Sequence, residues 1–204
     1  MREVQLLHQW LSPGFPTGAF AWSHGLDRLI DDGEVGTALQ LQAWLEGVLR
    51  HGGGRSDAVL AAAVLRKPED WCTAAELAAA LAPSRERHAE TMDQGTSFAR
   101  AVGLEPAAYP IVFARAAARE GIAGDLALTL YLQAMVANLV SAAIRAVPLG
   151  QTDGQAVASA LHPLCAEIAS AALAASLDEV GTCTIRADMA SLHHETQYSR
   201  MFRS

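Results

Sequence analysis

Charged residues and cysteines are both scarce in this sequence. Asp, Glu, Lys and Arg make up 18% of the 204 residues, below the roughly 25% that is usual in soluble domains. Hydrophobic residues reach 51%, a share that excludes intrinsic disorder. The three cysteines (Cys72, Cys165 and Cys183) lie far apart and form no CxxC pair, which is typical of a reducing compartment. Either the interior is unusually large, or apolar surface is left for other proteins.

The sequence also lacks the charge and hydropathy signals of several protein classes. The net charge is −7 and no segment concentrates Lys or Arg, so nucleic-acid binding is not expected. The most apolar stretch, residues 122–147, is interrupted by Asp125, Gln133, Asn138 and Arg145, whereas a membrane span needs about 20 largely uninterrupted apolar residues. Residues 1–15 lack the apolar core and cleavage site of a signal peptide. We therefore expect a cytoplasmic protein that does not bind membranes.

Helical periodicity dominates what is present. Apolar residues follow the i, i+3, i+4, i+7 pattern between residues 41 and 49, with Thr37 as the N-cap, and Ser84 caps a long polar helix. Pro163 is a candidate kink in a later helix. The expected helices are 41–49, 56–65, 73–81, 84–102, 109–119, 125–147, 153–175 and 188–199. The sequence predicts an all-α fold with residues 1–204 as a single domain, a globular bundle of about nine or ten helices around a buried central helix.

The expected central helix is the one over residues 125–147. Its polar residues do not share one side, because Asp125 and Gln133 lie nearly opposite Asn138 and Arg145 at 100° per residue. A helix that is apolar nearly all round is typically buried. An unpaired Arg145 in such a helix would cost several kcal/mol, so it must reach a carboxylate, reach backbone carbonyls or line a wet cavity or an interface.

Residues 12–18 contain the turn residues of a phosphate loop but not its chemistry. No Lys follows the second glycine, and no strand precedes the segment, so both requirements of a phosphate loop fail. The turn instead fixes the position of nearby aromatic residues. Phe20 and Trp22 have two readings that the sequence does not separate: presentation to a partner, or packing in the core.

No residue group in the sequence points to catalysis or metal binding. His193 and His194 are adjacent, so on a helix their imidazoles point about 100° apart and cannot chelate one ion. The other histidines are scattered, and no GxSxG turn offers a nucleophile. We expect no catalytic residue, no metal site and no cofactor, and therefore no enzyme.

Two charged segments favour protein contacts. Glu86 and Glu90 are like charges at i, i+4, mildly unfavourable for a helix alone; a solvated face is the favoured reading and a partner-facing surface the second. The tail, residues 198–204, sets aromatic and apolar residues between arginines, the composition of an interface anchor, with docking onto its own fold as the alternative. Because few core residues are expected there, removing residues 200–204 should leave the fold largely intact.

Three blocks of the sequence resemble the UreF family of urease accessory proteins. Residues 12–27, SPGFPTGAFAWSHGLD, are similar to the family's SPxxPxGxFxxSxGLE signature, with Asp27 in place of the usual Glu. Residues 138–155, NLVSAAIRAVPLGQTDGQ, are similar to a second family stretch. Residues 194–204 resemble HETxxxRLFRS, with Met201 in place of Leu. The three blocks occur in the family's order over nearly the whole chain.

The resemblance implies a helical homodimer that acts without catalysis. It implies a complex with the accessory protein UreD (also called UreH), which contacts apo-urease, and with the GTPase UreG, which carries nickel. In that complex the protein bridges its partners so that nickel is inserted into urease. The residues that we expect to contact partners, on the resemblance and on the patterns above, are Phe20, Trp22, His24, Arg145, Gln151, His194, Glu195, Tyr198, Arg200, Phe202 and Arg203.

Two alternatives remain open on the sequence. The seven histidines allow a protein that carries nickel directly. A GTPase activator that supplies an arginine finger is the other alternative, for which Arg145, Arg200 and Arg203 are the candidates.

Overall fold

Ten α-helices and three short 3-10 helices form the regular structure of the computed structural model, which describes residues 1–204 and contains no strand. The all-α expectation is therefore confirmed. In chain order the elements are α1 (Arg2–Trp10), η1 (Ala19–Ala21), α2 (Leu26–Asp31), α3 (Ala38–His51), α4 (Gly53–Arg66), η2 (Pro68–Asp70), α5 (Trp71–Ala80), α6 (Arg85–Val102), α7 (Tyr109–Arg119), α8 (Gly124–Ala146), α9 (Gln151–Ala174), η3 (Leu177–Glu179) and α10 (Ile185–His194).

Local capping explains where several of these helices begin. The side chains of Thr37 and Ser84 accept hydrogen bonds from the backbone N–H groups of Gln40 and Arg87, as predicted for the starts of α3 and α6. Gly103 ends α6 in the left-handed conformation. The helices α1 and α2 were not predicted, because nine and six residues are too few for a clear periodic pattern.

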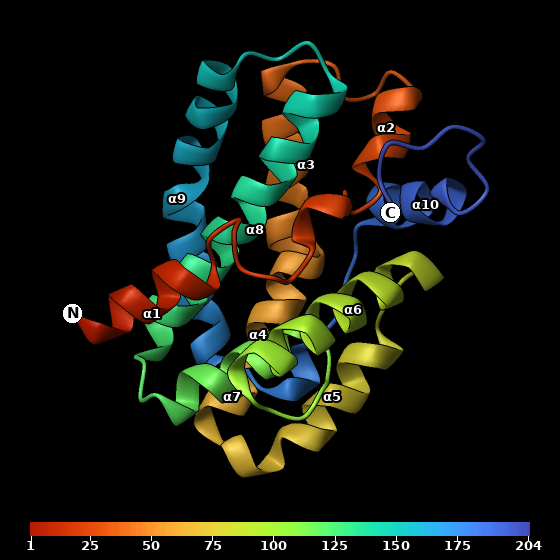
Figure 1. Cartoon of the computed structure of the whole chain (residues 1–204). Coiled ribbons are helices and arrows are strands. Elements are labelled where there is room, and N and C mark those ends of the chain that lie inside the picture. The colour runs from red at the N-terminus through yellow and green to blue at the C-terminus, as the bar shows by residue number, and fades with distance from the viewer.

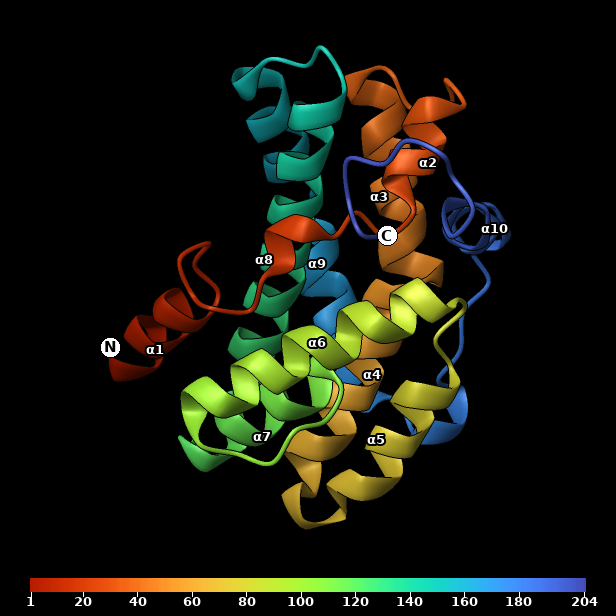
Figure 2. The same ribbon diagram turned by 45° about the vertical axis from the view of Figure 1, so that its right-hand side comes forward.

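The helices are arranged around two long columns (Figures 1 and 2). In one column α4 follows α3, interrupted at Gly52, and in the other α8 packs along α9. The pair α6 and α7 covers one end of α4, and α10 lies beside α2 at the other side of the molecule. Gly154 permits the close approach of α8 and α9, because a side chain there would overlap Ile144 and Val140.

The buried central helix is α4, and the expectation that residues 125–147 fill this role is wrong. Eight of the fourteen residues of α4 are buried, since α3, α5, α7, α8 and α9 all pack on it. By contrast, α8 leaves Ala137, Ser141 and Arg145 exposed along one side. Small alanine side chains in α4 let its neighbours surround it, a property that periodicity alone does not reveal.

Two helices are long and apolar enough to cross a membrane by length and composition, α8 and α9. About half of the residues in the most apolar part of each are buried against other helices, which is the pattern of core helices. Pro163 does not break α9. It lies on the exposed side, as does Ser159, so water can bond the Ser159 carbonyl that loses its helical donor.

The last helix is shorter than predicted. α10 ends at His194, whereas the sequence predicts a helix to Ser199. Beyond it the chain turns back, because the Asp27 carboxylate accepts hydrogen bonds from the backbone N–H groups of Met201 (2.8 Å) and Phe202 (3.1 Å). These side-chain bonds replace the helical ones, and they lay the tail against α2.

Candidate functional site

The first and the third of the three blocks noted in the sequence lie against each other in the structure. The tail, Gln197–Ser204, lies against the segment Ala19–Leu26, as the position of the C-terminus beside α2 shows (Figure 2). The Arg203 N–H donates to the carbonyl of Ala21 at 2.8 Å, and the Ser23 N–H donates to the carbonyl of Ser204 at 3.2 Å. The Ser23 hydroxyl also donates to that carbonyl. Two of the three blocks noted in the sequence therefore form one structural unit.

A buried histidine at the end of α10 links this helix to α2 and α6. His194 is 0% exposed, and its Nδ1 lies 2.6 Å from the Glu86 carboxylate while its Nε2 lies 3.3 Å from Asp27. The second Glu86 oxygen accepts from the Arg200 guanidinium at 2.7 Å. A carboxylate oxygen therefore faces each of the two ring nitrogens. This group, Asp27, Glu86, His194 and Arg200, is called the His194 cluster below.

A second buried cluster surrounds Glu90. Its carboxylate is bonded to the Arg87 guanidinium, lies 3.0 Å from His24 Nδ1, and accepts from the Ser204 hydroxyl at 3.0 Å. Burial alone would raise the pKa of Glu90, but the charges and hydrogen bonds of Arg87 and His24 outweigh it and lower the pKa to about 2. Burial and the charge of Arg87 lower the pKa of His24 and outweigh the opposing effect of Glu90. Glu90, Arg87, His24 and Ser204 are called the Glu90 cluster.

The backbone around His24 is tightly constrained. His24 has a positive φ of 60°, which is uncommon for a residue other than glycine, and Gly25 follows at 79°. A Cβ on Gly25 would lie 2.8 Å from the backbone nitrogen of Ser191 in α10, so only glycine fits there. The Nε2 atom of His24 is buried and has no hydrogen-bond partner. The fold therefore holds this imidazole at one place.

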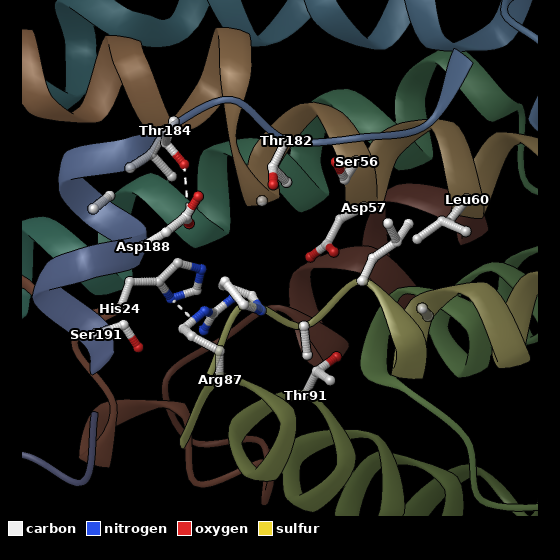
Figure 3. Close-up of a pocket in the computed structure, with 17 residues that line it drawn as sticks. His24, Ser56, Asp57, Leu60, Arg87, Thr91, Thr182, Thr184, Asp188 and Ser191 are labelled. Carbon is white, nitrogen blue, oxygen red and sulfur yellow. Dashed lines mark hydrogen bonds between the residues drawn. The ribbon is translucent and has the colours of Figure 1, made fainter. Parts of the chain in front are cut away.

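Two cavities meet at the Glu90 cluster. The larger has a volume of about 220 Å³ and opens between α1, the loop that follows it, α6 and α8. The smaller, about 60 Å³, lies between α4, α6 and α10 (Figure 3). His24, Asp57, Arg87 and Thr91 line both. Burial raises the pKa of Asp57 to about 6, even though the Tyr131 hydroxyl donates to its carboxylate at 2.8 Å.

Apolar side chains are exposed on α10 and on the tail that follows it. Ile185, Met189 and Leu192 are exposed at i, i+4 and i+7, and so form a stripe along one side of α10. Tyr198 and Met201 are exposed on the tail. These five residues are called the α10–tail surface. Elsewhere, Phe20 of η1 is 67% exposed.

The structure gathers most of the residues expected to contact partners, but it buries three of them. Trp22, His194 and Phe202 are buried within the chain, so in this conformation they have no surface to offer. Trp22 packs in the core, and the tail docks onto its own fold. For both, the structure therefore agrees with the alternative interpretation of the sequence and not with presentation to a partner. Phe20 and Tyr198 are exposed.

Of the remaining expected residues, Glu195, Arg203 and Arg145 contact the same region, and Gln151 does not. Glu195 accepts from the Arg85 N–H at 2.8 Å, and Arg203 lies over the Trp22 ring at 4.2 Å. The Arg145 guanidinium donates to the carbonyl of Phe20 at 2.8 Å, so it reaches backbone carbonyls, one of the three options that the sequence left. Gln151 is exposed at the start of α9, and no hydrogen bond joins it to the tail.

Sequence reasoning missed the carboxylates of these clusters. Glu86 and Glu90 were read as a solvated face or a partner-facing surface, yet both are buried, each facing one histidine and one arginine. The one feature of the sequence that pointed to this burial is the unfavourable i, i+4 spacing of the two glutamates. The fold tolerates these two like charges because each carboxylate has a cation of its own. Across the chain, His, Cys, Asp and Glu side chains form no group of three or more that could hold a metal ion.

The fold and this site define an all-α protein in which buried polar clusters hold a tail and a signature loop beside exposed apolar surface. A family model described as UreF matches residues 35–162. A "Urease accessory protein UreF" from Roseobacter denitrificans is 49% identical over 97% of this chain and 92% of its own length. Proteins of the same name from Cereibacter sphaeroides (strain KD131) and Methylobacterium sp. (strain 4-46) are 50% and 46% identical over 97% and 98% of this chain, and 97% and 88% of their own lengths. The chain belongs to the UreF family of urease accessory proteins.

Proposed function

We propose that this chain is a non-catalytic scaffold that holds the accessory protein UreD (UreH) and the GTPase UreG together, so that nickel is inserted into apo-urease. It acts in the cytoplasm and as a homodimer. Nickel is the cargo of the assembly in this proposal, and the chain itself supplies surfaces and positions.

The observation that carries the proposal is the α10–tail surface. Five large apolar side chains are exposed on two consecutive segments, and large apolar side chains that are exposed close together in the chain favour a protein–protein contact there. The tail segment is held by side-chain bonds to Asp27 and Glu86 rather than by a helix of its own. A surface fixed in this way is ordered before a partner arrives, which lowers the entropic cost of binding.

The positions of the three candidate arginines favour a scaffold over a GTPase activator. Arg200 is paired with Glu86 at 2.7 Å, and Arg203 with Asp93 at 3.1 Å. Arg145 donates to the carbonyls of Phe20 and Ser141. An arginine finger has to reach into the active site of another protein, and each of these side chains is engaged within its own fold.

Copurification tests the proposal directly. The chain is coexpressed with UreD and UreG, and the complex is measured by size exclusion and light scattering, which also report the number of copies of each chain. The double substitution Tyr198→Ser and Met201→Ser should weaken assembly and leave the helical signal unchanged. Val4→Ser removes an equally exposed apolar residue from α1, far from α10, and should have no effect. If the unmodified chain binds neither protein, the proposed function is wrong.

A further inference from the structure

Asp57 differs from Asp27, Glu86 and Glu90, the buried carboxylates of this protein. Asp27 and Glu86 both face His194, and Glu90 is bonded to Arg87 and His24. Asp57 forms no ion pair, and its one side-chain hydrogen bond comes from the Tyr131 hydroxyl. Arg87 lines the same cavities, but its guanidinium donates to Glu90 and to His24. Of the two carboxylates that line the larger cavity, Glu90 and Asp57, only Asp57 is without an ion pair. Asp188, which lines only the smaller cavity, also forms no ion pair and accepts a hydrogen bond from the Thr184 hydroxyl.

The carboxylate of Asp57 faces the cavities rather than bulk water. Asp57 is partly buried in α4, and it lines both the larger and the smaller cavity. In Figure 3 it points into the space that His24 and Arg87 also line. Burial of an ionised carboxylate without a counter-charge is unfavourable, which is why its pKa is raised to about 6. A cation brought into the cavity would remove this cost.

The larger cavity is lined by both apolar and polar residues. Leu11, Phe20, Ala134 and Met135 are among the wall residues, while Asp57 and Gln94 contribute polar groups. Its volume of about 220 Å³ is many times the roughly 15 Å³ that one water molecule requires. The space suits a chain of several methylene groups that ends in a charged head. Lys and Arg side chains have this form, since they place an apolar stem on apolar surface and a cation at its end.

We propose that the cavity between α1, α6 and α8 binds a Lys or Arg side chain of a partner protein, with the cationic head paired to Asp57. This inference rests on the proposed function, because it assigns the side chain to UreD or UreG. The charge of the site supports it: Glu90 and Arg87 offset each other, and Asp57 leaves one negative charge. Electrostatic complementarity of this kind selects the partner as well as adding affinity.

The first arm of the test uses a small probe, n-butylammonium chloride, with the purified chain. Binding is followed by NMR chemical-shift changes, and n-butanol serves as the uncharged probe of similar size. Butylammonium should bind more tightly than butanol, and its affinity should rise with pH through a midpoint near the pKa of Asp57, about 6. Asp57→Asn should abolish both the preference and the pH dependence. Asp178→Asn, an exposed carboxylate in η3 with the same change of charge, should leave both unchanged.

The second arm uses the partners. Asp57→Asn should weaken the complex with UreD or with UreG by about thirtyfold or more, the usual cost of removing one member of a buried ion pair. One Lys→Ala or Arg→Ala substitution in that partner should weaken binding to the unmodified chain by a similar factor. The same substitution should have little further effect on Asp57→Asn, since both remove one interaction.

Several outcomes overturn the proposal while leaving the proposed function intact. One is normal assembly of Asp57→Asn with both partners. Another is butylammonium binding that depends on Asp57, together with the absence of any Lys or Arg substitution in a partner that couples to Asp57→Asn. That result would assign the site to a free amine. Binding of Ni²⁺ that depends on Asp57, without binding of the amine, would make it a metal site. Failure of the unmodified chain to bind either partner overturns the proposed function, and with it the assignment to a partner side chain.

Discussion

The hydroxyl of Ser204 donates a hydrogen bond of 3.0 Å to the carboxylate of Glu90, although 114 residues separate them. Ser204 is 0% exposed, and Phe202 is buried as well. The tail is therefore part of the interior at these two positions. The expectation that residues 200–204 add little to the core is wrong. We therefore predict that removing them destabilises the fold, because the truncation takes Phe202 from the core and exposes the Glu90 cluster.

Substitution of Ser204 tests this relationship with the smallest change. Ser204→Ala should lower the free energy of unfolding by about 1–2 kcal/mol, since the Glu90 carboxylate and the N–H groups of Ser23 and His24 each lose a hydroxyl partner. Urea denaturation measures the change. Ser199→Ala, in an exposed part of the tail, should change stability by less than about 0.5 kcal/mol. Equal effects of the two substitutions would show that Ser204 is not docked.

His194 should be the most sensitive residue of the His194 cluster. His194→Ala removes the donor that separates Asp27 from Glu86, and it leaves two buried carboxylates facing each other. The expected loss of stability is about 3 kcal/mol or more. The adjacent His193 is exposed, so His193→Ala is the matched control and should be nearly neutral. Thermal unfolding of both variants measures the difference, and similar melting temperatures would contradict the assignment.

The sequence predicted the helices well and the interior charges poorly, for a physical reason. Periodicity and capping residues are local, and they placed α6 and α7 to within a residue. Whether Glu86 faces water or His194 depends on the position of a helix end 108 residues away. The central position of α4 likewise depends on which helices surround it. No local pattern carries that information, although the repulsive spacing of Glu86 and Glu90 marked the place.

The stability of the protein should depend on Asp57 between pH 4 and pH 6. The folded pKa of about 6 lies above the ordinary value of 3.8, so the folded chain retains a proton that the unfolded chain releases. The free energy of unfolding should therefore fall as pH rises through this window, by on the order of 3 kcal/mol from this group. Asp57→Asn should remove that contribution and be the more stable protein at pH 7. Chemical denaturation at a series of pH values measures it, and parallel curves for Asp57→Asn and the unmodified chain would refute the claim.

Arg145 should matter more for function than for stability. Its guanidinium is exposed, donates to the carbonyl of Phe20 at 2.8 Å and lies over the Phe202 ring at 4.6 Å. Arg145→Met keeps an apolar chain of similar length over the ring but loses the bond that positions Phe20. We expect a loss of about 1 kcal/mol in stability, together with reduced urease activation in cells that express the complete set of accessory proteins.

The control for Arg145 is Arg50→Met, which removes another exposed guanidinium, from α3, where it pairs with Glu167. This variant should activate urease normally, because an exposed ion pair contributes little. A loss of more than about 3 kcal/mol in Arg145→Met would instead assign Arg145 a structural role comparable to that of a buried ion pair. Full urease activation by a stable Arg145→Met protein would show that activation does not require the hydrogen bond between Arg145 and the Phe20 carbonyl. Arg145 would then have no functional role through the position of Phe20.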